Sequence, residues 1–236
     1  MYMKKELTLI LAVVICPFIT GSAMAAGTAD MSVGGTVITG SCTPTLSAST
    51  VDYGTIDVSR LTSTDEKAGN RLGFRDITLN VTCDSPMKVA WGVTDNRLGT
   101  AAWLSSDVEF LGPDYARAYF FGLGDTPEGK HIGSYSITLT ESGSTVDGGP
   151  AHFLQRANAS GPWTYLTNTT NADIYERDAA PDKQFTAGSP GTHEPMAATT
   201  ASYALSISLQ VDLMSNLNLT DDTVLDGSAT FTLVYL

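Results

Sequence analysis

The sequence predicts an all-β protein, an antiparallel β-sandwich of Greek-key type, on three observations. Several short segments alternate apolar and polar side chains with a period of two, which places one set of side chains on a core face. Turn material rich in Gly, Pro and Asn separates these segments. No segment carries the apolar stripe of an amphipathic helix. The 236 residues are enough for one such domain with its own hydrophobic core.

Residues 1–25 have the features of a secretory signal peptide. Two lysines precede the apolar run Leu7–Ile19, and Ala23-Met24-Ala25 provides a cleavage site before Ala26, with cleavage before Met24 as the alternative. The apolar run is too short to span a membrane comfortably. We therefore expect a soluble chain that is exported.

The cysteine content agrees with export. Cys16 is removed with the signal peptide, so the mature chain keeps only Cys42 and Cys83. In an oxidising compartment such a pair is expected to form a disulfide, the alternative being two unpaired buried thiols. One bridge is too few for a disulfide scaffold, and a hydrophobic core must supply most of the stability.

The formal charge of -12 argues against nucleic acid or an anionic membrane surface as a partner. It favours solubility and mutual repulsion of free subunits, but it indicates no ligand.

Strands are predicted in order along the mature chain. The predicted strands are Thr36–Cys42, Val51–Ile56, Phe74–Cys83, Met87–Val93, Ala118–Leu123, Ser134–Thr140, Ala151–Gln155, Tyr203–Leu213 and Gly227–Leu236. Asp84-Ser85-Pro86 is predicted to be the turn of a hairpin between the third and fourth of these. Residues 142–150 and 168–200 are predicted to be long loops, where an exposed and variable surface would be built.

Both ends of the mature chain carry weaker signals of the same kind. At one end, Ala229, Phe231, Leu233 and Tyr235 alternate with polar or smaller residues, and the pattern runs to the last residue. Chain ends usually fray, so an apolar strand that runs to the last residue indicates that this strand has a role of its own. At the other end a small alternation precedes the hinge Gly34-Gly35; its members are Gly27, Ala29, Met31 and Val33. The alternatives are an ordinary closing strand and a disordered leader.

Catalytic and metal-binding patterns are not found in the sequence. The three histidines, His131, His152 and His193, have no metal-site spacing and are expected on the surface. There is no G-x-S-x-G elbow and no H-E-x-x-H motif. Trp163 and Trp103 have rings that can stack on sugars, whereas Trp91 lies on a strand face and is expected in the core. We expect no enzyme activity and no cofactor.

These features together resemble the subunits of chaperone-usher fimbriae of Gram-negative bacteria. The resemblance rests on V-G-G-T-V-I-T-G-S-C-T-P at Val33–Pro44, V-D-Y-G-T-I at Val51–Ile56, T-L-N-V-T-C at Thr78–Cys83 and the terminal F-T-L-V-Y-L with penultimate Tyr235. The first two segments look most like a less studied group of fimbrial-type proteins. The resemblance implies an immunoglobulin-like sandwich of pilin type over residues 34–236.

The resemblance also implies a role for both ends. The family's sandwich lacks its final strand, and a chaperone strand and then the N-terminal extension of the next subunit fill the gap by β-strand addition. Residues 26–33 would be that donor strand, contributing Gly27, Ala29, Met31 and Val33. Phe231, Leu233 and Tyr235 would line the receiving groove, and basic chaperone residues would hold the Leu236 carboxylate. Three features differ from the familiar pattern: the position of the glycine upstream of Tyr235, an extension before Gly34 that is short and less apolar, and the long, loop-rich middle.

Two functions of different kinds follow for the exported protein. The first is a structural subunit that reaches the cell surface through the periplasm, polymerises by donor-strand exchange and supports adhesion. Its partners would be a periplasmic chaperone, an outer-membrane usher and other fimbrial subunits. The second is a minor or tip subunit that binds a glycan or protein receptor of the host through its loop-rich middle. A secreted β-sandwich enzyme is disfavoured because no acid, base and nucleophile cluster is found.

Overall fold

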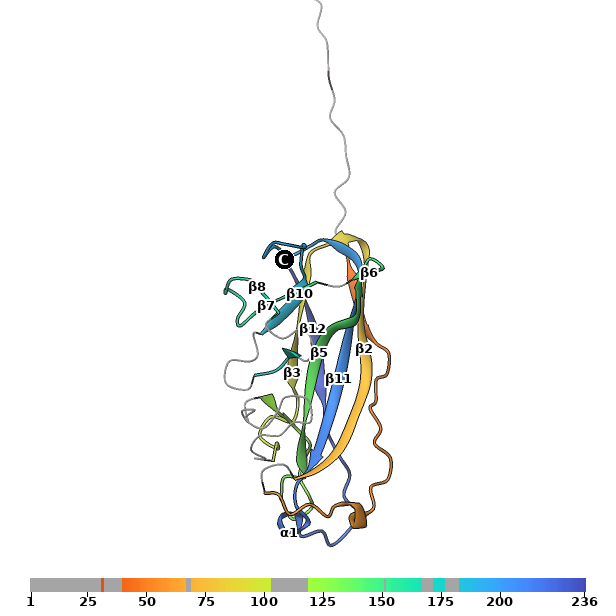
Figure 1. The fold of residues 1–236 in the computed structure, drawn as a ribbon, viewed down its shortest axis with the longest axis vertical. Coiled ribbons are helices and arrows are strands. Elements are labelled where there is room, and N and C mark those ends of the chain that lie inside the picture. Colours follow the sequence, from red (N-terminus) through yellow and green to blue (C-terminus); the bar gives the residue numbers. More distant parts are fainter. Residues whose placement is uncertain are drawn as a thin grey trace, which may run out of the picture. The chain divides into compact units, whose positions relative to one another are not determined.

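Two antiparallel sheets form the fold, as the period-two pattern predicts. The computed structural model describes residues 31, 40–66, 69–102, 119–150, 152–166, 172–176 and 183–236. The first sheet has the order β1-β2-β11-β5-β4, with β6 and β9 also pairing β5, and Figure 1 shows β2, β11 and β5 side by side. Its strands are β1 Cys42–Leu46, β2 Asn70–Met87, β4 Phe121–Gly122, β5 Gly133–Val146, β6 Gly149–Pro150, β9 Ala172–Asp173 and β11 Ala198–Val211.

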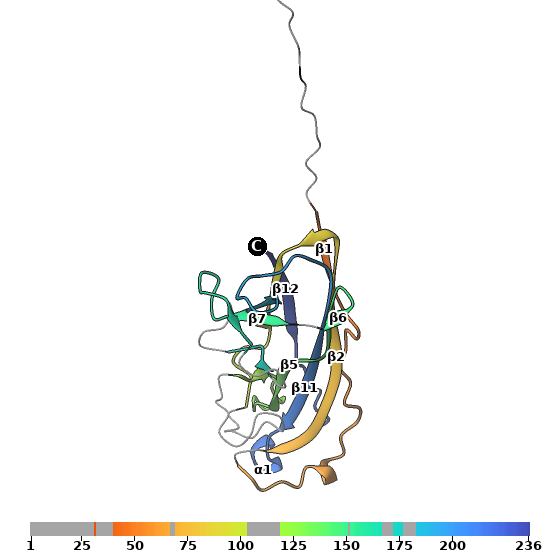
Figure 2. The same cartoon turned by 45° about the horizontal axis from the view of Figure 1, so that its top comes forward.

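The second sheet has the order β12-β3-β10-β7-β8. Its strands are β3 Val89–Asp95, β7 Phe153–Arg156, β8 Thr164–Tyr165, β10 Gln184–Ala187 and β12 Ala229–Tyr235. Helical structure in the described residues is limited to the 3-10 turn η1, Val58–Arg60, and the one-turn helix α1, Met214–Leu217. No helix in this part of the chain is long and apolar enough to cross a membrane. In Figure 2, α1 lies at the opposite end of the sandwich from the end of β12.

The core lies between the two sheets within the unit Thr39–Leu236. Every second side chain of the long strands is buried there: Ile77, Leu79 and Val81 in β2, Tyr203, Leu205 and Ile207 in β11, and Trp91 and Val93 in β3. Trp91 is 1% exposed, as predicted, and packs against rings from both sheets. Its ring centroid lies 4.9 Å from that of Phe185 in the second sheet and 5.3 Å from that of Tyr203 in the first.

The predicted hairpin between Phe74–Cys83 and Met87–Val93 is wrong. β2 continues through Asp84-Ser85-Pro86, the predicted turn, and ends at Met87, which pairs with Ala198 of β11. After Lys88 the chain enters β3, which belongs to the other sheet. The two strands therefore face each other across the core and do not pair.

Two further sequence predictions are corrected. Val51–Ile56 is not a strand, because its backbone belongs to no ladder. Its apolar side chains Val51, Tyr53 and Ile56 are nevertheless half-buried and pack on the core. Residues 142–150 are not a loop. β5 extends to Val146 and turns back into β6 through Asp147 and Gly148, both at positive φ, the conformation that a two-residue hairpin turn requires.

Candidate functional site

The strand β12 forms one edge of the second sheet and pairs only with β3 among the described strands. The ladder is continued at its two ends by the Leu236 N–H, which donates to the Lys88 carbonyl at 3.1 Å, and by the Asn96 N–H, which donates to the Ser228 carbonyl at 3.0 Å. In an antiparallel pair the residues that exchange hydrogen bonds recur at every second position. The even-numbered residues from Ser228 to Leu236 therefore direct their backbone groups toward β3.

The odd-numbered residues of β12 direct their backbone groups to the other side, away from β3. They are Ala229, Phe231, Leu233 and Tyr235, each with one N–H and one carbonyl. No strand in the described part of the chain pairs with them. We call this row of groups the open edge of β12.

The side chains along the open edge lie partly in the core. Ala229, Phe231 and Leu233 are half-buried and pack against the hydrophobic cluster, and the Phe231 ring centroid lies 5.8 Å from that of Trp91. Tyr235 and Leu236 are 53% and 45% exposed. The three residues predicted to line a groove, Phe231, Leu233 and Tyr235, thus all have backbone groups on the open edge, whereas the Leu236 N–H is directed to β3.

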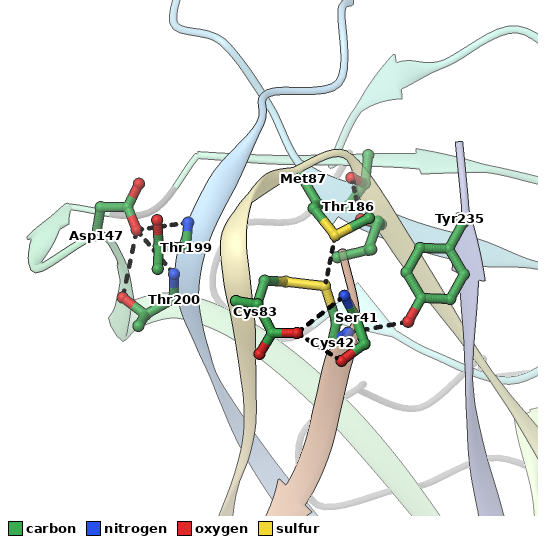
Figure 3. Close-up of a disulfide and its surroundings, with 11 residues drawn as sticks. Ser41, Cys42, Cys83, Met87, Asp147, Thr186, Thr199, Thr200 and Tyr235 are labelled. Carbon is green, nitrogen blue, oxygen red and sulfur yellow. Dashed lines mark hydrogen bonds between the residues drawn. A yellow bond between two sulfur atoms is a disulfide. The ribbon is translucent and has the colours of Figure 1, made fainter. Parts of the chain in front are cut away.

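The strand β1 lies against the end of β12, although it belongs to the first sheet. The Cys42 N–H donates a hydrogen bond to the Tyr235 hydroxyl oxygen at 2.9 Å. Figure 3 shows the Tyr235 side chain reaching from β12 to the backbone of β1. Half-buried apolar side chains continue this side of the site, from Leu46 in β1 to Val51, Tyr53 and Ile56 beyond it.

A disulfide fixes β1 at this point, as predicted. Cys42 and Cys83 are bonded and occupy facing positions of β1 and β2. The Met87 Sδ atom lies 3.8 Å from the Cys42 Sγ atom, and Ser41 donates a hydrogen bond through its hydroxyl to Asp84 at 2.8 Å (Figure 3). The end of β12 is thereby connected through Tyr235 to a covalently anchored strand.

The beginning of β12 is held by an ion pair that the sequence did not indicate. Arg97, just beyond β3, donates two hydrogen bonds to the Asp226 carboxylate, at 2.8 and 2.9 Å. These bonds lower the pKa of Asp226 below its ordinary value. The Asp226 N–H also donates to the Leu123 carbonyl at 2.9 Å. β12 is therefore anchored just before its first residue and at its last.

Tyr53 secures the half-buried segment that follows β1. Its hydroxyl donates a hydrogen bond to the Ile207 carbonyl of β11 at 2.8 Å, and the Arg75 guanidinium lies 4.9 Å from the centre of its ring. This segment therefore contacts the first sheet by side chains and leaves its own backbone out of the ladder.

The remaining candidate residues lie away from the open edge. His131 pairs with Asp125 at 2.6 Å, whereas the rings of His152 and His193 each pack edge-on against Tyr165, at centroid distances of 4.9 and 4.4 Å. The described residues contain no group of three or more His, Cys, Asp or Glu side chains placed to hold a metal ion. Trp163 lies under the Arg156 guanidinium at 4.3 Å.

Most of the predicted donor strand falls outside the described residues. Gly27, Ala29 and Val33 are not described, nor are the signal peptide at 1–25 and Trp103. Met31 is described alone, and its side chain is 87% exposed. The donor strand therefore stays a prediction, since only Met31 of its four named residues is described.

One contributor to the site was missed although the sequence carried a signal for it. Pro44 lies in the middle of β1, and a proline within a strand indicates an edge position because it lacks an N–H. The hydrogen bond between Cys42 and Tyr235 had no such signal, since it joins residues 193 positions apart.

The fold and the site together define an all-β sandwich with one open edge strand. The family model described as "Protein of unknown function (DUF1120)" matches residues 31–136, which include both cysteines. "Protein GltF" of Escherichia coli (strain K12) is 28% identical over 256 aligned residues, covering all of both chains. "Uncharacterized protein YhcF" of the same organism is 27% identical over 233 residues, 93% of this chain and 95% of that protein. None of these descriptions states an activity.

Proposed function

We propose that this protein is a structural subunit of a bacterial surface fimbria that polymerises by donor-strand exchange. In this proposal the chain is exported to the periplasm, a chaperone occupies the open edge of β12, and an outer-membrane usher replaces the chaperone by the N-terminal segment of the next subunit. The assembled fibre supports cell adhesion. The protein is no enzyme and needs no cofactor for this role.

One observation carries the proposal: β12 is a long sheet edge without proline or charge, whereas the edge of β2 that β1 leaves uncovered, Asn70–Thr78, carries Arg71, Arg75 and Asp76. Natural sheets blunt their edges by shortness, proline, charge or a covering segment. The edge strands β4 and β8 have two residues each, and β1 contains Pro44. β12 has seven residues, Ala-Thr-Phe-Thr-Leu-Val-Tyr, with no proline and no charge. Such an edge is a template for another strand.

The chemistry of the edge fits an extended peptide as its occupant. In β-strand addition the main chain provides affinity and alternate side chains provide register. The outward backbone groups of β12 belong to the same odd-numbered residues whose side chains pack on the core, so an added strand would also cover Phe231 and Leu233. An inserted strand would thereby bury apolar surface and satisfy unpaired main-chain groups at once.

The N-terminal segment of a second copy is the proposed occupant in the fibre. Residues 26–33, Ala-Gly-Thr-Ala-Asp-Met-Ser-Val, alternate in the required way and are followed by two glycines that allow a hinge. The side chains on the inserted face would be Gly27, Ala29, Met31 and Val33. Small residues suit an edge whose own side chains are already half-buried.

A second candidate is a minor or tip subunit that binds a host glycan or protein. One observation favours it. The β7–β8 side of the second sheet brings together Arg156 and Trp163, and next to them Tyr165 with two histidine rings. Aromatic faces beside hydrogen-bonding groups are suited to sugars. This surface lies at the sheet edge opposite β12, so binding there is compatible with strand exchange.

Deletion of residues 26–33 tests the first candidate. Chaperone binding should survive because the open edge is unchanged, and polymerisation should be lost because no donor remains. A matched control replaces the same eight residues by Gly and Ser, which keeps length and removes the apolar side chains. Fibres formed by either variant would refute the donor assignment. A wild-type chain that stays monomeric even when its chaperone and usher are supplied would refute the proposal as a whole.

Electron microscopy of cells labelled for this protein separates the two candidates. Label along the fibre shafts supports a structural subunit, whereas label only at the tips supports the second candidate. Surface fibres that never carry the label would refute both.

A further inference from the structure

The outer edge of β1 has few backbone groups to offer to another strand. The Asp84 N–H donates to the Ser41 carbonyl at 3.0 Å, and the Ser47 N–H donates to the Thr78 carbonyl at 2.9 Å. By the alternation of an antiparallel ladder, the odd-numbered residues of β1 face β2. Cys42, Pro44 and Leu46 therefore direct their backbone groups outward.

Two of these three outward positions cannot donate a hydrogen bond to an incoming strand. Pro44 has no N–H. The Cys42 N–H is already bonded to the Tyr235 hydroxyl at 2.9 Å. Only the Leu46 N–H is left as a donor in the described part of this edge, beside the carbonyls of the three residues, so an incoming strand could exchange hydrogen bonds in both directions at one position only.

The Tyr235 side chain also occupies the space between the two edges. A strand inserted between β12 and β1 would separate them by about 9.6 Å, twice the usual spacing of neighbouring strands. The Tyr235 side chain reaches across this space from β12 to the Cys42 N–H of β1 (Figure 3). The disulfide between Cys42 and Cys83 keeps β1 from moving away. An inserted backbone thus meets a barrier at this end.

We propose that Tyr235 is a positioning residue that sets the limit of strand insertion, and that the inserted strand pairs with β12 alone. This inference rests on the proposed function and specifies it. The inserted strand forms hydrogen bonds with the outward backbone groups of Ala229, Phe231 and Leu233, and its pairing with β12 stops before Tyr235. The edge of β1 stays unpaired because of Pro44 and the Tyr235 hydroxyl. The occupant is the extended segment 26–33 of a second copy of this chain.

Amide hydrogen exchange with and without a peptide tests this limit. The mature protein is mixed with excess synthetic peptide Ala-Gly-Thr-Ala-Asp-Met-Ser-Val. The peptide is expected to slow exchange at Phe231 and Leu233 at least about fivefold, the factor for one net hydrogen bond, and to leave Tyr235 and Leu46 unchanged. Slower exchange at Tyr235 and Leu46 as well would overturn the inference while supporting the proposed function. No effect at any residue of β12 would overturn both.

Two variants isolate the role of the tyrosine. Tyr235→Ala should extend the protection by the peptide to residue 235. Tyr235→Phe keeps the ring and should speed exchange of the Cys42 amide about fivefold without any peptide, because only the hydroxyl acceptor is lost. Thr232→Ala is the matched control, since its backbone faces β3, and should change neither result. An unchanged Cys42 amide in Tyr235→Phe would overturn the inference even if Tyr235→Ala does not fold.

Discussion

Removal of the disulfide is expected to destabilise the sandwich by an amount that the structure allows us to calculate. The bridge joins residues 41 positions apart. In the chain-entropy relation a loop of that size restricts the unfolded chain by about 4 kcal/mol at 25 °C. Replacing both cysteines by serine should therefore lower the free energy of unfolding by about 4 kcal/mol. With a urea dependence of about 2 kcal/mol per M, the unfolding midpoint should fall by about 2 M.

Urea unfolding followed by circular dichroism measures this change, and reduction of the wild-type protein by dithiothreitol is the matched control. Reduction opens the same loop without changing the side-chain volume at Cys42 or Cys83. Both samples should show the same shift. A loss below about 1 kcal/mol would refute the reasoning, because it would mean that β1 and β2 stay together in the unfolded ensemble or that β1 contributes nothing to the fold.

Three other perturbations have defined outcomes. Leu79→Ala, at a side chain that is 1% exposed, should lower the free energy of unfolding by about 3 kcal/mol in the same assay. Gly133→Ala should cost about 1–3 kcal/mol because the added methyl group meets backbone of β11, whereas Gly149→Ala, whose methyl group meets only ordinary contacts, should be nearly neutral. The pKa of Asp226 is lower in the folded protein than its unfolded-state value of 3.8. Its ion pair with Arg97 therefore stabilises the start of β12 above about pH 3.8, and this stabilisation is lost as the pH falls through the lower folded-state pKa. Exchange of the Thr230 amide, which is directed to β3, should rise relative to its intrinsic rate below about pH 4 in the wild type and show no such step in Asp226→Asn.

The long strands could be predicted from the sequence because burial on one face leaves a period-two pattern. Tyr203, Leu205 and Ile207 alternate with polar residues and are all buried in β11. The same reasoning failed where strands had to be assigned to partners. The alternation of Phe74–Cys83 and Met87–Val93 is the same for a hairpin and for two strands that face each other across a core. Asp84-Ser85-Pro86 between them are turn-forming residues. They stay in β2 all the same, because β2 pairs with β11 as far as Met87.

The segment Val51–Ile56 shows that alternation reports burial and not backbone pairing. Tyr53 faces the core and bonds to Ile207 through its hydroxyl, which fixes the side chain without a ladder. Val51 and Tyr53 alternate as in a strand, but Gly54 has a positive φ and the next half-buried residue, Ile56, lies three positions after Tyr53. The residues of the candidate site were predicted for the same reason, since Phe231 and Leu233 carry the pattern themselves.

The anchors of β12 could not be predicted, because they depend on contacts between distant parts of the chain. Arg97 and Asp226 are 129 positions apart, and both are charged residues in turn-rich sequence. Nothing in their neighbours indicates that they meet. The same holds for Tyr235 and the Cys42 amide, whose contact requires that β1 begins where β12 ends.

These anchors explain how an unpaired strand can stay ready for a partner. An edge strand free at both ends would lose conformational entropy when a second strand binds, and this loss would reduce the affinity. β12 is fixed by Asp226 before its first residue, by the ladder with β3 along its length and by Tyr235 at its end. Only the incoming strand then has to be ordered. The open edge of β12 is thus preorganised, which is the property that the proposed role of strand acceptor requires.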